Sequence, residues 1–206
     1  MDKNKMFANA CDMWAIDAQM LGSLKDIVNQ DEYAAAFELI HCCTGRVATM
    51  GMGTSSVAAR KIAHMLCVAN VPSYFVSAGD AAHGALGSVQ EGDIMIALSK
   101  GGNTEELVNL IDSLHEKKIK LITVTQDPDS RLAKAADVVL NLKIEESDHK
   151  AMLPTASIIS IIAIFDAIAD EMTMQPQFSE RIFYFNHNHG AVGALLKEKT
   201  EKNREN

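Results

Sequence analysis

The stretch IALSKGGNTEEL, residues 96–107, decides the fold class. Residues 93–99 form an almost continuous apolar run that ends in a serine, and two adjacent glycines follow it. Residues 103–118 then place their apolar side chains at helical spacing. An apolar run of this kind is typical of a parallel strand that is buried on both faces, and helical periodicity directly after it indicates a crossover helix. The stretch therefore predicts a strand, a bare loop and an amphipathic helix.

The same alternation of strand and helix extends along most of the chain. We expect strands at residues 46–53, 73–77, 93–99, 120–126 and 137–144. We expect helices before residue 43 and at residues 54–70, 103–118, 131–136 and 155–172. Such alternation predicts an α/β fold, a three-layer α/β/α sandwich around a five-stranded parallel sheet. We divide the chain into a helical lead-in (1–34), one domain (35–197) and a frayed, charged tail (198–206).

Composition excludes several classes of protein. The formal net charge is −8 and no basic run is visible, which argues against a nucleic-acid partner but not against a small anionic ligand. The four cysteines have no metal-ligand spacing, so we expect buried free thiols and neither a metal nor a cofactor. The most apolar segment, residues 155–169, is too short to span a bilayer, and the N-terminus lacks an apolar core of signal length. We therefore expect a cytoplasmic protein without a membrane partner.

Two glycine-containing loops follow predicted strands, where parallel sheets bind their ligands. GMGTSS (51–56) opens a helix, and the N–H groups of a helix start suit a phosphate. It matches neither a dinucleotide fingerprint nor a P-loop, and a tight turn with Thr54 or Ser55 as helix cap explains it equally well. SKGGNT (99–104) repeats the arrangement after the third predicted strand, residues 93–99.

The second loop also contains residues with two possible roles. Gly101 and Gly102 allow close approach of backbone to a ligand. Asn103 is placed to cap the following helix, with Glu106 at its third position as in a capping box and Glu105 near the positive end of the helix dipole. Glu106 therefore has a structural role available as a cap.

Six motifs in order resemble a sugar isomerase (SIS) domain. They are GMGTSSVAARKIA, DAAHGALGSV, DIMIALSKGGNTEEL, DPDSRLAKAADVVL, LPTAS and HNHGAVGALL, and they look most like the arabinose-5-phosphate isomerase branch. The resemblance covers residues 35–197. It implies the same five-stranded sandwich, a homodimer or homotetramer with active sites between subunits, and a solitary domain without the CBS repeats that many of these isomerases carry.

The resemblance also implies a set of site residues. The phosphate-binding positions fall on Gly53, Thr54, Ser55, Ser99, Lys100, Gly101, Gly102, Asn103 and Thr104. The catalytic positions fall on His83, Glu106, Glu146 and His187. Two positions depart from the family pattern, because Thr54 stands where a lysine is usual and Gly101 where a serine is usual. Either Lys100 supplies the missing positive charge, or the substrate or activity has changed.

The implied reaction is the interconversion of an aldose and a ketose phosphate through an enediol, which needs an acid–base pair and no redox cofactor. We assign proton transfer to His187 and one glutamate, ring opening or hydroxyl binding to His83, and phosphate binding to the serine and threonine hydroxyls of the two loops. Two other functions stay open: isomerisation of a hexose or heptose phosphate, and a non-catalytic sensor of sugar phosphates.

Overall fold

The computed structural model describes residues 2–144, 153–191, 193, 194 and 197. Its centre is a sheet of five parallel strands in the order β2-β1-β3-β4-β5. The strands are β1 (Val47–Gly51), β2 (Ser73–Phe75), β3 (Ile94–Leu98), β4 (Lys120–Thr125) and β5 (Val138–Asn141). All five residues of β1 and of β3 are buried, which agrees with their apolar sequences.

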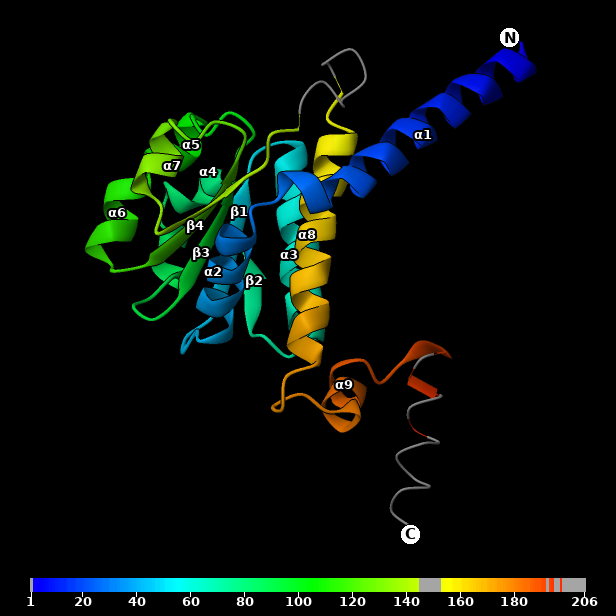
Figure 1. The fold of residues 1–206 in the computed structure, drawn as a ribbon. Helices are drawn as coiled ribbons and strands as arrows, with labels where there is room; N and C mark the ends of the chain where they lie inside the picture. The colour runs from blue at the N-terminus through cyan, green and yellow to red at the C-terminus, as the bar shows by residue number, and fades with distance from the viewer. Residues whose placement is uncertain (1, 145–152, 192, 195–196, 198–206) are drawn as a thin grey trace.

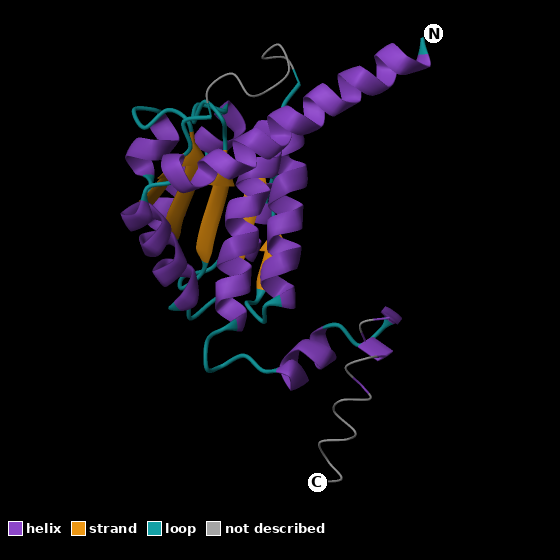
Figure 2. Cartoon of the chain, turned by 45° about the vertical axis from the view of Figure 1, so that its right-hand side comes forward, coloured by secondary structure: helices purple, strands orange, loops and turns teal. Residues whose placement is uncertain are grey.

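Helices cover both faces of this sheet, as Figures 1 and 2 show. The helices in the described part of the chain are α1 (Lys3–Ile27), α2 (Gln30–His41), α3 (Thr54–Val68), α4 (Ala78–Ala81), the 3₁₀ helix η1 (Ala85–Ser88), α5 (Glu105–Val108), α6 (Ile111–Glu116), α7 (Arg131–Ala135), α8 (Ala156–Thr173) and α9 (Glu180–Asn186), and α2 to α8 cover the sheet. The predicted α/β/α sandwich with a five-stranded parallel sheet is confirmed.

Alternate residues of each strand feed two separate cores. Ile94, Ile96 and Leu98 of β3 pack with α2, α3 and α8 on one face, whereas Met95 and Ala97 pack with α4 to α7 on the other. This division follows from the two-residue period of a strand, which sends successive side chains to opposite faces. The two cores fix the sheet between its helical layers, and so fix the loops at the ends of the strands.

The amino-terminal edge of the sheet is held by one buried carboxylate. Asp93 Oδ1 accepts a hydrogen bond from the Arg46 backbone N–H at 2.7 Å, and Asp93 Oδ2 accepts from the Gln90 N–H at 3.0 Å and from the Tyr74 hydroxyl at 3.3 Å. Burial acts to raise the pKa of Asp93, but these backbone bonds and the Arg46 guanidinium outweigh it and hold the pKa below its ordinary value. The carboxylate thus joins the starts of β1, β2 and β3.

Three local predictions were wrong. The helix expected at 103–118 is two helices, α5 and α6, because the Leu110 N–H bonds to the Leu107 carbonyl three residues back and tightens the chain there. Helix α9 occupies a segment where no helix was expected, and it contains Phe185 and Asn186, the first two residues of the FNHNHG stretch. The four cysteines are free as predicted but not buried; Cys43 is half-buried and the other three are exposed.

Helix α1 extends away from the sandwich, and its C-terminal part packs against α8 (Figure 1). No helix among the described residues combines the length and the apolar character needed to cross a bilayer.

Candidate active site

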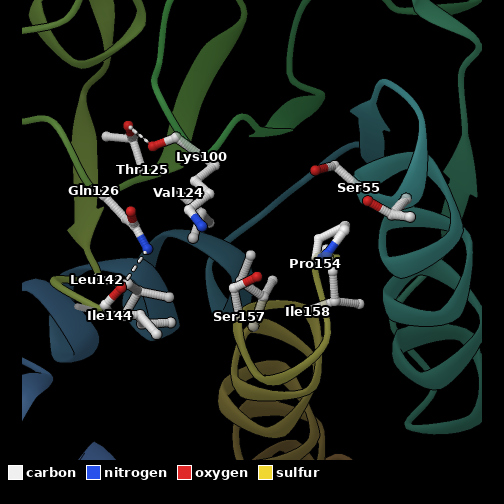
Figure 3. Close-up of a pocket in the computed structure, with 12 residues that line it drawn as sticks. Ser55, Lys100, Val124, Thr125, Gln126, Leu142, Ile144, Pro154, Ser157 and Ile158 are labelled. Carbon is white, nitrogen blue, oxygen red and sulfur yellow. Dashed lines mark hydrogen bonds between the residues drawn. The ribbon is translucent and has the colours of Figure 1, made fainter. Parts of the chain in front are cut away.

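A pocket opens at the carboxyl-terminal edge of the sheet, beside the point where the strand order reverses between β1 and β3 (Figure 3). It encloses about 460 Å³ of empty space including its mouth. Its lining residues are Thr54, Ser55, Lys100, Val124, Thr125, Gln126, Leu142, Ile144, Pro154, Ser157, Ile158 and Ile161. Reversal points of this kind are where open α/β sheets bind their ligands.

Two long helices begin at this pocket. Helix α3 has 15 residues and starts at Thr54, and α8 has 18 residues and starts at Ala156. The N-cap of α3 is Gly53, which has no side chain, and the Ser55 and Ser56 N–H groups donate to the Met52 and Gly53 carbonyls at 3.1 Å. The N-cap of α8 is Thr155, whose side chain does not cap the first N–H groups. The start of a helix carries partial positive charge on its first N–H groups, so two such starts favour an anion between them.

The wall of the pocket that contains residues 100 and 126 is held by hydrogen bonds to backbone carbonyl oxygens. The Lys100 carbonyl accepts from Thr125 Oγ1 at 3.1 Å and from the Gln126 N–H at 2.9 Å. Gln126 Nε2 donates to the Ile144 carbonyl at 3.0 Å, which joins this wall to the segment after β5. Figure 3 shows the Lys100 side chain reaching into the pocket from this wall, with Ser55 on the other side. The ammonium group therefore belongs to the pocket.

The remaining hydroxyls of the SKGGNT loop face each other. Ser99 is buried, and its Oγ lies 2.8 Å from Thr104 Oγ1. This pair closes the loop, and neither residue is among those that line the pocket. Of the nine predicted phosphate-binding residues, the structure places Thr54, Ser55 and Lys100 at the pocket surface.

The three loop glycines have different surroundings. Gly102 is buried with a φ of +62°, and a Cβ there would collide with the Ser130 side chain. Packing against Ser130 is therefore sufficient to require glycine at this position. Gly101 has open space where its Cβ would lie. Gly53 is the N-cap of α3 with a φ of +55°, a conformation that glycine adopts at little cost.

The predicted capping box is wrong. Helix α5 begins at Glu105 after Thr104, so Glu106 is its second residue and Asn103 lies outside it. Asn103 Oδ1 instead accepts from the Arg131 N–H at 3.1 Å, and Arg131 pairs with Glu105 at 2.6 Å. The hydrogen bond from Arg131, with its charge, lowers the pKa of Glu105. Glu105 thus has a structural partner, whereas Glu106 is exposed with none among the described residues.

Of the described catalytic candidates, His83 and Glu106 lie on neighbouring elements and His187 lies far from both. His83 is exposed in the turn after α4, which packs beside α5, the helix that carries Glu106. His187 ends α9 at the opposite end of the molecule, where its ring stacks on Phe183. Glu146 lies outside the described residues.

The chemistry of the pocket is therefore that of a binding site. Among its described lining residues there is no histidine and no carboxylate, and Lys100 is the single charged group. Across the described part of the chain, no cluster of three or more His, Cys, Asp or Glu side chains is placed to hold a metal ion. The lining can hold an anion and hydroxyl groups.

Sequence reasoning missed Gln126 and Ser157 as pocket residues. Gln126 directly follows the buried strand β4, as Ser99 follows β3, and this position was a usable signal. Ser157 is buried in the first turn of α8 and is the last residue of the LPTAS motif, which was a usable signal for it.

Comparison with known proteins identifies the family, because the SIS domain matches residues 39–170. The chain belongs to the SIS domain family. Arabinose 5-phosphate isomerase KdsD of Escherichia coli O157:H7 is 37% identical over 183 residues, which are 88% of this chain and 56% of that protein. The chain thus spans about half the length of this curated relative.

Two solved structures share the fold closely. A candidate sugar-phosphate isomerase from Listeria monocytogenes str. 4b F2365 is 37% identical, with a TM-score of 0.88 over 92% of this chain and 100% of that one. Protein c3406 of Escherichia coli CFT073, solved in complex with arabinose 5-phosphate, is 26% identical, with a TM-score of 0.85 over 91% of this chain and 100% of that one.

Proposed function

We propose that this SIS domain protein is an aldose–ketose isomerase of sugar phosphates, with arabinose 5-phosphate and ribulose 5-phosphate as the first pair to test. The observation that carries the proposal is the pocket in which Lys100 lies beside the starts of α3 and α8. Three sources of positive charge around one pocket favour a phosphate group. The similarity to isomerases of this substrate class supports the reaction.

The proposed reaction moves one proton between adjacent carbons. A base removes the proton from C2 of the open-chain aldose, which gives an enediolate; a proton then moves between O2 and O1, and a proton is added at C1 to give the ketose. Ser55, Lys100 and the helix starts hold the phosphate, which fixes the reacting end of the sugar against the acid–base groups. Glu106 and His187 are the proposed proton-transfer groups, Glu146 is the alternative acid, and His83 assists ring opening.

Because His187 lies far from the pocket of its own chain, the proposal requires an oligomer. Asn186, the preceding residue, donates to Asn70 Oδ1 just beyond the end of α3, while Thr54 at the start of the same helix lines the pocket. A 15-residue helix is about 22 Å long, so His187 does not reach its own pocket. We therefore place His187 in the pocket of a second copy, within a homodimer or homotetramer.

One observation favours a different function. The described residues that line the pocket can bind a ligand but include neither an imidazole nor a carboxylate. Such a lining is sufficient for a non-catalytic sensor of sugar phosphates. The other alternative is an isomerase of a hexose or heptose phosphate. The position of Lys100 supports binding of a phosphate group but does not distinguish between sugars of different length.

The test is to incubate the protein with a panel of pentose, hexose and heptose phosphates and to follow each sugar by NMR. The proposal predicts interconversion of one aldose–ketose pair, and the pair names the substrate. Binding of a sugar phosphate with no interconversion across the panel would support the sensor and contradict the isomerase.

A further inference from the structure

The pocket contains a side-chain amide to which the proposed function gives no role. Gln126 directly follows β4 and lines the pocket, and it is half-buried. We infer that Gln126 is a specificity-determining residue: its amide binds one hydroxyl of the sugar and so favours polyhydroxylated phosphates over phosphates that lack this hydroxyl. The inference rests on the proposed function for the class of ligand, a sugar phosphate, and adds which part of the sugar the pocket recognises.

Both the backbone and the side chain of Gln126 are held in place. Its backbone N–H donates to the Lys100 carbonyl at 2.9 Å, which ties it to the loop after β3. Its side-chain Nε2 donates to the Ile144 carbonyl at 3.0 Å. The segment that carries Ile144 is itself fixed to β4, because the Leu142 N–H donates to the Thr125 carbonyl at 2.8 Å. The amide therefore has a defined position before a ligand enters, which reduces the entropic cost of binding.

The bond to Ile144 also determines which way round the amide lies. A carbonyl oxygen only accepts hydrogen bonds, so the nitrogen of the amide has to face Ile144 and Oε1 has to lie on the other branch. Figure 3 shows the nitrogen directed to Ile144 and the oxygen turned away from it. Among the described residues, no group donates to Oε1, and Nε2 uses one of its two N–H groups. The amide thus offers a ligand one acceptor and one donor.

A sugar hydroxyl matches this pair of groups, because a hydroxyl both donates and accepts hydrogen bonds. A phosphate dianion matches it less well, because its oxygens only accept and Oε1 repels them. Val124, Leu142 and Ile144 line the pocket with apolar side chains, which offer the amide no hydrogen bonds when a ligand displaces water. A ligand without a hydroxyl at this point leaves the amide unpaired, and a site built to bind a hydroxyl rejects such analogues.

Two ligands separate recognition of a hydroxyl from recognition of the phosphate. Arabinitol 5-phosphate has the hydroxyls and the phosphate but no carbonyl, so it cannot be isomerised. The compound n-pentyl phosphate has the same number of carbons and the same phosphate, but no hydroxyls. A protein group that binds the hydroxyl contributes to the affinity for the first ligand alone.

The experiment measures the dissociation constants of both ligands by calorimetry at fixed ionic strength, for the wild type, Gln126→Met and Gln175→Met. Methionine has a similar length to glutamine but lacks the amide. Gln175 is also half-buried and lies just beyond the C-terminal end of α8, whereas the pocket is at the start of that helix, so Gln175→Met is the matched control.

We expect Gln126→Met to bind arabinitol 5-phosphate about five- to tenfold more weakly than the wild type and to bind pentyl phosphate equally well. Gln175→Met should bind both ligands as the wild type does. If Gln126 only braces the segment at Ile144, the variant should lose affinity for both ligands together, and that result would overturn the inference. Unchanged binding of arabinitol 5-phosphate would overturn it too, as would a wild type that prefers neither ligand.

A second measurement starts from the wild type and uses analogues of arabinitol 5-phosphate that each lack one hydroxyl. One analogue should bind the wild type about five- to tenfold more weakly than the parent compound, and should bind Gln126→Met as tightly as the parent does. A wild type that binds every analogue as it binds the parent would overturn the inference. Because none of these compounds can be isomerised, a sugar panel without interconversion would remove the proposed isomerase and leave the role of Gln126 standing.

Discussion

The Asn186 side chain donates to Asn70 Oδ1 at 3.2 Å. This hydrogen bond places Asn186, and with it the next residue, His187, at the end of α3 that is far from the pocket. This contact separates two parts of the proposed catalytic machinery by the length of a helix. The proposed activity therefore requires a second copy of the chain, and this requirement can be tested.

We predict that two inactive variants restore each other. In a site shared between copies, His187→Ala and Glu106→Gln damage different contributions to the same site. A statistical 1:1 mixture of dimers should then regain about a quarter of wild-type turnover. Turnover after subunit exchange is the measurement, with each variant exchanged against itself as the control. Full activity of His187→Ala alone, or no recovery after exchange verified by mass spectrometry, would contradict the shared site.

Glu106→Gln separates a structural role from a catalytic one. Because Glu106 is exposed and caps no helix, we expect the free energy of unfolding to change by less than about 0.5 kcal/mol. Loss of an acid–base group should lower turnover by about 100-fold or more. Glu105→Gln is the matched control, because the neighbouring carboxylate pairs with Arg131 and has no catalytic role here. Equal turnover in the two variants would rule out Glu106 as an acid–base group.

Gly102 and Gly101 should respond oppositely to alanine. Gly102→Ala places a Cβ in the left-handed region and against Ser130, so it should lower the free energy of unfolding by about 2–4 kcal/mol. Gly101→Ala meets open space and should leave stability nearly unchanged. Urea unfolding of the two variants is the measurement. A Gly102→Ala protein as stable as Gly101→Ala would show that the loop packs differently from this structure.

Asp93 should make stability depend on pH. Its pKa is lower in the folded protein than in the unfolded chain, so its contribution is complete above the unfolded value and is lost as the pH falls through the folded value. Asp93→Asn should cost about 2 kcal/mol at pH 7, because the buried donors of residues 46 and 90 lose a charged acceptor. The difference between wild type and variant should shrink below about pH 4. A constant difference from pH 7 to pH 2 would be inconsistent with this role.

The sheet was predictable because its signal is local. Each strand is an apolar run of about the observed length, and the helices between the strands follow from periodicity. The break between α5 and α6 was not predictable, since Leu107, Leu110 and Leu114 keep the same apolar spacing on both sides of it. The spacing of these leucines predicted which face of the segment is buried, but it did not predict the tightened turn between α5 and α6.

The pocket was predictable in position but not in detail. Thr54, Ser55 and Lys100 follow strands and lie at the expected edge. The pairing of Asn103 and Glu105 with Arg131 depends on a contact between segments 26 or more residues apart, which no local pattern contains. The position of His187 likewise depends on a contact between the segment after α8 and the C-terminal end of α3.

The most direct test of the account is proton exchange at the sugar carbons. Wild-type protein is incubated with arabinose 5-phosphate in deuterated water, and both sugars are recovered and examined by NMR. The account predicts that ribulose 5-phosphate forms and that deuterium enters C1 of the ketose and C2 of the recovered aldose, because an enediol links them. A protein that binds the sugar phosphate while both sugars stay free of deuterium would contradict it.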